Sequence, residues 1–376
     1  MHRSVQAAAC EATSLACMAE MTTLPTDDLT ALFQAIVDIE SVSRNECALA
    51  NAVEATLQGC AHLEILRDGD AIIARTNLAR PERVIIAGHL DTVPVAGNLP
   101  SKLVDGVLFG RGTVDMKGGV AVMTQLAVQL AAPTRDITWV FYDREEIASA
   151  ENGLGRLAAN HPEWLAGDLA ILMEPTSAQV EAGCQGTIRV DVTTRGLAAH
   201  SARAWMGHNA IHDIAEVVRR VVEFDAGPVD VDGLTYREGL NVTMINGGVA
   251  GNVIPDACVA QVNFRFAPDK STEQAVAILR ELFAGFEQDF VDISPAARPG
   301  LNISATQDFI KAVGDEVKVG PKYGWTDVAR FSALGIAALN YGPGDANKAH
   351  ADDESCPVEQ VELCATTLRR WLTAAD

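Results

Sequence analysis

Two side chains suited to metal chemistry, His89 and Asp91, follow an apolar run in the segment "RVIIAGHLDTVPVAG", residues 83–97. The apolar run predicts a buried strand, and side chains two positions apart in a strand point to the same face. In open α/β sheets, ligands bind beyond the carboxyl ends of the strands. The alternative is a histidine whose hydrogen bonds are satisfied within a strand-to-loop turn, and other parts of the sequence decide between the two.

Four further stretches place acidic or imidazole side chains where strands are expected to end. They are "GRGTVDMKGG" with Asp115, "DREE" with Glu145 and Glu146, "MEPT" with Glu174, and "AHADDE" with His350. Each stretch alone is equally consistent with solvated loop carboxylates, but together they would repel one another without cations. Histidine and carboxylate ligands without thiolates suit zinc or a similar divalent metal. A bridging carboxylate would hold two metals about 3.5–4 Å apart.

These motifs, in this order, resemble the dinuclear zinc amidohydrolases, a family that includes carboxypeptidase G, aminoacylase and acetylornithine deacetylase. The resemblance covers nearly all of the chain from about residue 23 onward. It implies two Zn²⁺ ions, for which Co²⁺ can substitute. The implied ligands are His89 and Glu174 for one metal, Glu146 and His350 for the other, and Asp115 as the bridge.

The same resemblance assigns further roles near the metals. It implies that Asp91 orients the His89 imidazole and that Glu145 is the general base for a metal-activated water. It also implies a cis peptide bond between Asp115 and Met116. No G-x-S-x-G elbow or G-x-x-x-x-G-K-[ST] phosphate loop occurs in the sequence, so neither a serine hydrolase nor a P-loop enzyme is indicated.

Three longer segments are most similar to the actinobacterial type of succinyl-diaminopimelate desuccinylase, namely "GWTDVARF", "GPGDANKAHADDESCPVEQ" and "GGVAGNVIPDACVAQVNFRF". The resemblance implies hydrolysis of N-succinyl-LL-2,6-diaminopimelate to succinate and LL-2,6-diaminopimelate in lysine and diaminopimelate biosynthesis. Asn252 and Arg265 match positions that bind the substrate. One departure is that Cys184 and Gln185 stand where well-studied desuccinylases carry an arginine-rich stretch.

Two alternative functions remain at the level of sequence. One is a related N-acyl-amino-acid deacylase such as acetylornithine deacetylase. The other is a metal-binding protein without turnover, and the presence of Glu145 argues against it because this residue serves only proton transfer.

A histidine outside the metal motifs, His200 in "GLAAHSARAWMGHNA", has a role by resemblance only. The family uses the histidine of this loop to stabilise the tetrahedral intermediate in the partner subunit's active site. The resemblance therefore implies a homodimer in which His200 is catalytic. On the residues alone, a surface-loop histidine is the alternative.

The elements that must position these residues follow from hydrophobic periodicity. The expected elements are a helix within 25–39, a helical segment at 53–58, a hairpin over 62–77, strands over 83–91, 136–146 and 168–176, and helices over 118–132 and 151–165. Strands that alternate with helices predict an α/β fold with a mostly parallel sheet covered on both faces. We expect a catalytic domain over 23–183 and 297–376.

The pattern changes in the middle of the chain and predicts an inserted α+β, ferredoxin-like domain over 184–296. The resemblance implies that this domain acts as a lid and in dimerisation. Its expected elements are strands over 186–196, 240–248 and 256–268 and helices over 209–224 and 271–286. The helix over 209–224 should bury one apolar face. That face is expected to comprise Ile211, Ile214, Ala215, Val218 and Val222.

Composition limits the class of partner. Fifty acidic and 29 basic residues give a formal charge of -21, which argues against nucleic acid or an anionic membrane as a partner. No run of 18 apolar residues occurs, and the eight cysteines form no C-x-x-C pair. We therefore expect a cytoplasmic protein, and the resemblance implies that it is an enzyme with a small-molecule N-acyl amino acid substrate. Residues 1–22 are expected to be a disordered extension, and Met21 is an alternative start.

Overall fold

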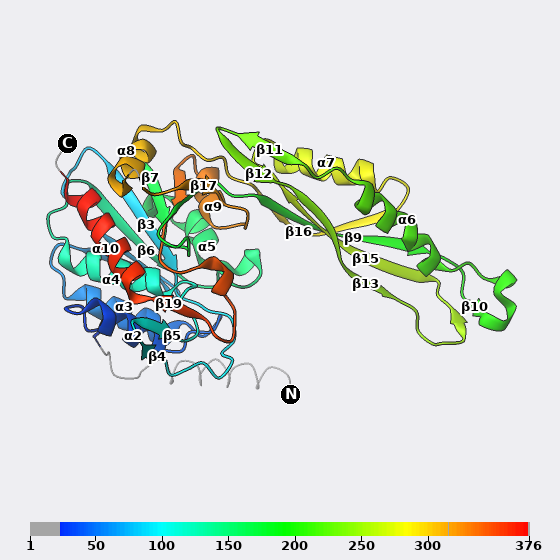
Figure 1. Ribbon diagram of the computed structural model, residues 1–376, viewed down its shortest axis with the longest axis horizontal. Helices are drawn as coiled ribbons and strands as arrows, with labels where there is room; N and C mark the ends of the chain where they lie inside the picture. Colours follow the sequence, from blue (N-terminus) through cyan, green and yellow to red (C-terminus); the bar gives the residue numbers. More distant parts are fainter. Residues whose placement is uncertain (1–22, 315, 375–376) are drawn as a thin grey trace. The chain divides into compact units, whose positions relative to one another are not determined.

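The computed structural model describes residues 23–314 and 316–374, so the extension expected over 1–22 lies outside the described residues (Figure 1). The chain divides into two compact units. The catalytic unit runs to Glu181 and also contains Gly300–Gly320 and the residues from Arg330 onward. The inserted unit comprises Ala182–Pro299 together with Pro321–Ala329, a segment that the sequence analysis places in the catalytic domain.

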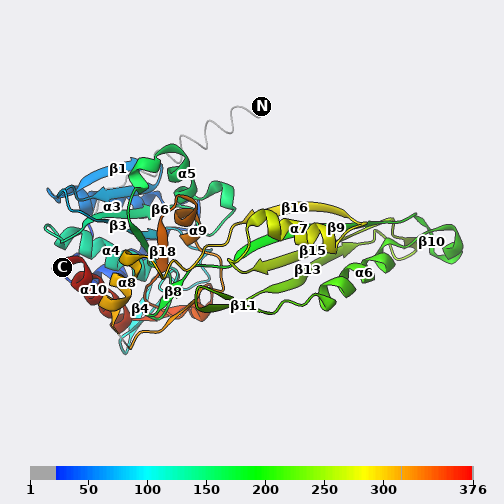
Figure 2. The ribbon, with the colours of Figure 1, turned by 90° about the horizontal axis from the view of Figure 1, so that it is seen from above.

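An eight-stranded sheet forms the centre of the catalytic unit, with the order β1-β2-β6-β3-β7-β18-β8-β17. Strands β1, β3, β6, β8 and β18 of this sheet are labelled in Figure 2. The strands are β1 (Glu64–Asp68), β2 (Ala71–Arg75), β3 (Arg83–His89), β6 (Asp136–Tyr142), β7 (Leu169–Leu172), β8 (Val180–Ala182), β17 (Val319–Pro321) and β18 (Ala337–Asn340). Strands β6, β3, β7 and β18 are parallel, and β2 joins β6 in the antiparallel sense. The structure thus confirms the mostly parallel sheet.

The central strands are apolar because they are covered on both faces. Every residue of β6 is buried, as is every residue of β3 after the first. Register places His89 beside Tyr142, the last residue of β6, and Ala87 beside Leu172, the last residue of β7. Three neighbouring parallel strands therefore end together, and the residues that follow them share one edge of the sheet.

Helices and a small sheet complete the catalytic unit. The helices are α2 (Leu29–Asp38), α3 (Cys47–Gln58), α4 (Lys117–Gln129), α5 (Gly153–Asn160), α8 (Ser304–Val313), α9 (Val328–Ala333) and α10 (Val358–Thr373), with 3₁₀ turns at Ser149–Glu151, Pro162–Leu165 and Ala346–Lys348. Helix α4 packs on β3 and β6, while α2 and α10 pack against α4. Strands β4 (Lys102–Val104), β5 (Val107–Phe109) and β19 (Ser355–Pro357) form a separate three-stranded sheet.

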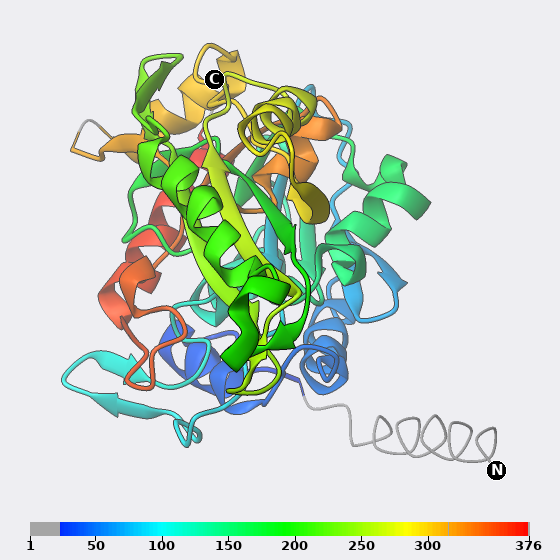
Figure 3. The ribbon, with the colours of Figure 1, turned by 90° about the vertical axis from the view of Figure 1, so that its right-hand side faces the viewer.

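The inserted unit contains a four-stranded antiparallel sheet with the order β13-β15-β9-β16. Its strands are β9 (Gly186–Arg195), β13 (Gly239–Gly247), β15 (Ala257–Phe266) and β16 (Glu287–Ser294), and its helices are α6 (Ala210–Glu223) and α7 (Thr272–Leu282). Two short pairs are added, β10 (Ala199–His200) with β14 (Val253–Ile254) and β11 (Pro228–Val231) with β12 (Leu234–Arg237). Both helices share one apolar core with the sheet. Figure 3 shows the ribbon of α6 lying across the strands.

The buried face of α6 differs from the expected one. The sheet covers Ala210, Ile214, Val217 and Val221, whereas Val222 is 78% exposed. Helix α6 carries valine or isoleucine on two adjacent stripes, so periodicity alone does not select between them. Packing against β9, β13 and β15 buries the stripe spaced i, i+4, i+7 and i+11.

Within residues 23–314 and 316–374, no helix combines the length and apolar character needed to cross a bilayer.

Candidate active site

The site begins where the parallel strands of the catalytic unit end. His89 is the last residue of β3 and Asp91 lies two residues beyond it, and both side chains are buried. Glu174 follows β7 by two residues and is also buried. The Met173 N–H extends the pairing of β7 with β3 by donating to the Ala87 carbonyl at 2.9 Å. The sheet edge therefore holds Glu174 on the strand next to that of His89.

A buried carboxylate, Glu354, shapes the loop that carries Asp115. Its Oε1 accepts hydrogen bonds from the N–H groups of Val114 and Asp115 at 2.9 and 3.2 Å. Its Oε2 accepts from the Gly112 N–H at 3.0 Å and from Arg111 Nη1 at 2.9 Å. The Asp115–Met116 peptide bond is cis, as expected from the resemblance. Asp115 thus leaves the loop at a fixed position just before α4.

The imidazole of His89 lies between two aspartates. Its Nε2 is 3.1 Å from Oδ1 of Asp115. Its Nδ1 is 2.9 Å from the main-chain oxygen of Asp91 and 3.5 Å from that residue's Oδ1. A proton on Nδ1 satisfies both Asp91 oxygens and leaves Nε2 as the nitrogen available to a metal.

His350 completes the cluster from a distant part of the chain. Its Nε2 lies 2.9 Å from Oε1 of Glu146 and 3.5 Å from Oδ2 of Asp115. One ligand atom from each of His89, Asp115 and Glu146 lies within 4.8 Å of the others. The structure therefore brings together His89, Asp115, Glu146 and His350 and places Glu174 on the same sheet edge.

Charges in this cluster compensate one another. Hydrogen bonds to Asp115 and Glu146 raise the pKa of His350 to about 10. Burial acts to lower the pKa of His89, but its bonds to Asp115 and Asp91 raise it well above the usual range. Burial opposes ionisation of Asp115 as well, yet the two histidines lower the pKa of this carboxyl. The imidazolium groups therefore neutralise carboxylates that a divalent cation would otherwise neutralise.

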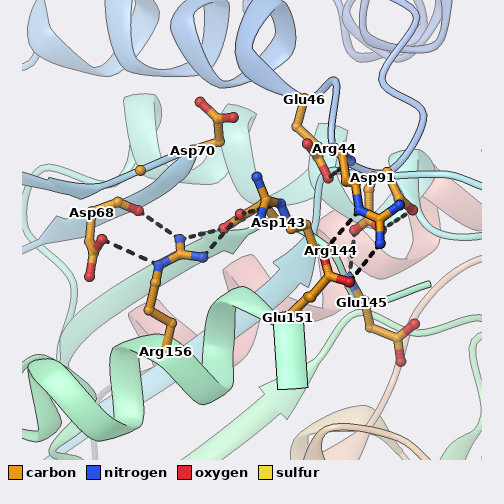
Figure 4. Close-up of polar contacts among 12 residues, drawn as sticks. Arg44, Glu46, Asp68, Asp70, Asp91, Asp143, Arg144, Glu145, Glu151 and Arg156 are labelled. Carbon is orange, nitrogen blue, oxygen red and sulfur yellow. Dashed lines mark hydrogen bonds and ion pairs between the residues drawn. The ribbon is translucent and has the colours of Figure 1, made fainter. Parts of the chain in front are cut away.

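Asp91 also fixes the loop that carries Glu145 and Glu146 (Figure 4). Its Oδ1 accepts from the Glu145 N–H at 2.9 Å, and its Oδ2 accepts from the Glu146 N–H at 3.1 Å and from Ser43 Oγ at 2.7 Å. Burial acts to raise the pKa of Asp91, but the hydrogen bonds from His89 and from this loop lower it overall. One carboxylate consequently couples the position of His89 to that of Glu145.

The donor set suits a pair of divalent metals. Imidazole nitrogen atoms approach Asp115 from both sides, His89 Nε2 at Oδ1 and His350 Nε2 at Oδ2, and the carboxylate of Glu146 adjoins them. Such nitrogen and oxygen donors are typical zinc ligands. A carboxylate approached on both oxygens is able to bridge two ions.

Three predicted site residues lie in the inserted unit. His200 ends β10 and is exposed, and its Nδ1 accepts the Ala202 N–H at 3.0 Å. The neutral imidazole therefore carries its proton on Nε2. Asn252 is also exposed. It lies close to His200, because its main-chain oxygen accepts the N–H of the next residue, Ser201, at 2.9 Å. Arg265 is half-buried on β15 between Thr187 and Gly239, and burial lowers its pKa.

The departure at Cys184 and Gln185 has a structural consequence. Both residues are buried, and the main-chain groups of Cys184 pair with Ala297 at 3.0 Å in each direction. The Gln185 side chain donates to the Arg237 carbonyl at 2.8 Å. These two positions serve the packing of the inserted unit.

The sequence analysis missed several residues that shape the site. Glu354 lies in the "AHADDE" stretch with His350, but nothing in that stretch distinguishes it from its acidic neighbours. Ser43 reaches Asp91 from a segment with no chemical motif. Asp143 precedes the loop of Glu145 and Glu146, and its Oδ1 accepts a hydrogen bond from Arg156 Nη2 at 2.7 Å. The only sequence signal for Asp143 is its place before Glu145.

Comparison with known proteins identifies close relatives. A family model described as Peptidase family M20/M25/M40 matches residues 85–374. The chain is 52% identical over 344 residues to the putative succinyl-diaminopimelate desuccinylase DapE of Mycobacterium tuberculosis H37Rv, covering 91% of this chain and 97% of that protein. It is 46% identical over 356 residues to the succinyl-diaminopimelate desuccinylase of Corynebacterium glutamicum, covering 92% and 96% of the two chains.

A solved structure shares the fold. Aminopeptidase PepT from Bacillus cereus ATCC 10987 superposes with a TM-score of 0.76 at 18% identity, covering 93% of this chain and 98% of that chain. At this identity the likeness concerns the arrangement of helices and strands in both units.

Proposed function

Because the chain belongs to peptidase family M20/M25/M40, we propose that it is a metal-dependent amidohydrolase that cleaves N-succinyl-LL-2,6-diaminopimelate into succinate and LL-2,6-diaminopimelate. The observation that carries the proposal is identity of 46–52% over more than nine-tenths of the chain to desuccinylases. The cluster around Asp115 supports it, because it brings together histidine and carboxylate side chains of the kind that hold catalytic divalent metals. The reaction serves diaminopimelate and lysine biosynthesis, and we place it in the cytoplasm.

The proposed metal centre uses the residues at the sheet edge. His89 and Glu174 would hold one zinc ion, Glu146 and His350 would hold the other, and Asp115 would be shared by both. Bound zinc would lower the pKa of a water molecule and polarise the amide carbonyl. Asp91 keeps the Nδ1 proton of His89 in place, so that Nε2 faces the metal.

Glu145 performs the proton transfers in this proposal. Its carboxylate accepts a proton from the attacking water and then donates it to the amine nitrogen that leaves. The hydrogen bond from its N–H to Asp91 fixes the main chain from which the carboxylate extends. The base and the His89 ligand are therefore aligned by the same buried group.

The inserted unit supplies the remaining functions. We propose that Arg265 binds a carboxylate of the substrate through its guanidinium group and that Asn252 donates an amide hydrogen bond. His200 donates from Nε2 to the developing oxyanion in the partner subunit's site of a homodimer. Strand β13 is an edge of its sheet, and its exposed Met244 and Ile245 offer an apolar surface for such pairing.

An assay with competing substrates tests the proposed function. Purified, zinc-reconstituted protein is given N-succinyl-LL-2,6-diaminopimelate or N-acetylornithine in separate reactions, and release of the free amine is measured. We expect kcat/KM to be at least about 10²-fold higher for the succinyl substrate, because its additional carboxylates pair with cationic groups that acetylornithine leaves unpaired. The reverse order would identify an N-acyl-amino-acid deacylase instead.

A second prediction concerns His200 and the dimer. His200→Ala should lower kcat by about 10²-fold, since it removes an oxyanion donor. Mixing His200→Ala chains with Glu145→Gln chains should restore about one quarter of the wild-type activity, because half of the random dimers then contain one intact site. Activity is measured after verified subunit exchange. No recovery in verified heterodimers would show that His200 acts within its own chain.

A further inference from the structure

The loop that carries Glu145 and Glu146 is closed at its base. It spans residues 144–152, between β6 and α5, and its ends meet where the Gly153 N–H donates to the Asp143 carbonyl at 2.7 Å. Loops whose ends lie together in this way behave as compact units. The geometry at Asp143 therefore sets the position of the entire loop.

Arg156 clamps this base through Asp143 (Figure 4). Its Nη2 donates to Oδ1 of Asp143 at 2.7 Å and its Nη1 donates to Oδ2 at 3.2 Å, so the contact is bidentate. The Asp143 side chain is only 2% exposed, which reduces screening of the pair by water. Bidentate arginine–carboxylate contacts fix direction as well as distance.

The guanidinium group of Arg156 also contacts another strand of the sheet. Its Nη2 also donates to the main-chain oxygen of Asp68 at 2.8 Å, and its Nε lies 3.3 Å from Oδ1 of that residue. Asp68 ends the edge strand β1, whereas Asp143 follows the buried strand β6. Arg156 on α5 thus ties the loop base to two strands at once.

Gly153 shows how tightly the base is packed. A Cβ atom at this position would lie 2.2 Å from Oδ1 of Asp143 and 2.8 Å from its main-chain oxygen. Only a residue without a side chain lets α5 begin this close to the carboxylate. The close approach brings Arg156, one turn along the helix, onto Asp143.

A second ion pair on this loop differs in its environment. Arg44 contacts Glu151 through Nε at 2.9 Å and Nη2 at 2.6 Å, which is also bidentate. The side chains of Arg44 and Glu151 are 62% and 33% exposed, so water and salt screen this ion pair. The loop therefore has a buried bidentate ion pair at its base and an exposed bidentate ion pair near its end.

We propose that Arg156 is a positioning residue for the general base and the adjacent metal ligand, acting through Asp143 at the base of the 144–152 loop. The inference rests on the proposed function for its kinetic consequence, whereas the ordering of the loop does not. Asp91 holds the first part of the loop through the N–H groups of Glu145 and Glu146, and Arg156 holds the base of the loop through Asp143. Without the Arg156 contacts, the ends of the 144–152 loop are no longer fixed, and the Glu145 carboxylate samples positions away from the attacking water. The chemical step then slows, whereas substrate binding is not weakened.

Three variants test the proposal. Arg156→Met keeps the unbranched stem of the side chain and removes both forked contacts, Arg156→Lys keeps the charge and loses the fork, and Arg44→Met is the matched exposed control. Each is assayed for kcat and KM on the succinyl substrate at saturating zinc. Hydrogen exchange of the peptide covering 143–153 is followed in metal-free protein.

The expected pattern separates positioning from general destabilisation. Arg156→Met should lower kcat by about 10- to 10²-fold, with KM within about threefold of wild type. The kcat of Arg156→Lys should lie between that of wild type and that of Arg156→Met. Exchange should accelerate in 143–153 and remain unchanged elsewhere in the catalytic unit. Arg44→Met should stay within about threefold of wild-type kcat.

Other outcomes overturn the proposal. Wild-type kcat in Arg156→Met, an equal loss in Arg44→Met, or faster exchange throughout the catalytic unit of both Arg156 variants would each contradict a positioning role. A wild-type protein that hydrolyses neither substrate would refute the proposed function, and the exchange data would still decide whether Arg156 orders the loop.

Discussion

Chelation of divalent metal is expected to reduce hydrolysis of the succinyl substrate to the background rate, and zinc or cobalt should restore it. Without a cation, the imidazolium of His350 occupies the space between Glu146 and Asp115, and neither water nor carbonyl is activated there. The measurement is turnover after treatment with a strong chelator, followed by titration with Zn²⁺ or Co²⁺. Full activity should require two ions per chain.

The same titration should release protons. His350 has a pKa of about 10 in the metal-free protein and is therefore protonated at neutral pH. A metal ligand must be deprotonated, so binding displaces this proton, and apparent metal affinity should rise with pH. Calorimetry in buffers of different ionisation enthalpy measures the number released. Full activity with fewer than one metal per chain, or binding without proton release near pH 7, would contradict this description of the site.

Glu145→Gln is expected to lower kcat by about 10³-fold while both metals stay bound. The amide has the size of the carboxyl group but does not accept the proton of the attacking water. The main-chain hydrogen bond from residue 145 to Asp91 remains possible, so the loop should keep its position. Steady-state kinetics and elemental analysis of the same preparation measure the two effects together.

Two neighbouring glutamates serve as controls for this variant. Glu151→Gln lies on the same loop and changes only an exposed pair with Arg44, so its kcat should be close to wild type. Glu146→Gln should instead lose metal, because Glu146 contacts His350 at 2.9 Å within the cluster. If Glu145→Gln lost metal and Glu146→Gln retained it, the roles within the "EE" pair would be exchanged.

The residues proposed to bind substrate explain why specificity is harder to assign than chemistry. Arg265 has a guanidinium half-buried in the open sheet of the inserted unit, attracted by Asp292 and repelled by Arg189. A carboxylate of the substrate would replace solvent around that cation. Cys184 and Gln185 are committed to internal contacts, so the carboxylates of the substrate must be recognised by other side chains.

The sequence by itself indicated the parallel sheet and the residues at its edge. Apolar runs that end in His89, Glu145 and Glu174 predict strands that terminate in polar groups. Parallel strands joined by helices end on the same side, so local order along the chain determines which edge holds the chemistry. The motif order also supported the family, which the family model and the relatives confirm.

Only the tertiary structure identified the groups that fix those residues in place. Glu354 orders the Asp115 loop from more than two hundred positions away, and Arg156 reaches Asp143 and Asp68 from a helix with no chemical motif. Carboxylates and guanidinium groups occur throughout any polar sequence, and their partners depend on which segments fold together. The spacing of residues along the chain does not predict such contacts.

The face of α6 illustrates the same limit within a single element. Periodicity located the amphipathic helix over 209–224, but Val222 of the expected apolar face is exposed and Val221 is buried. A helix with two adjacent apolar stripes gains a similar hydrophobic free energy by burying either stripe. The packing of α6 against β9, β13 and β15 selected one of them, because that choice filled the core shared with α7 and left Ile211, Ala215 and Val222 exposed.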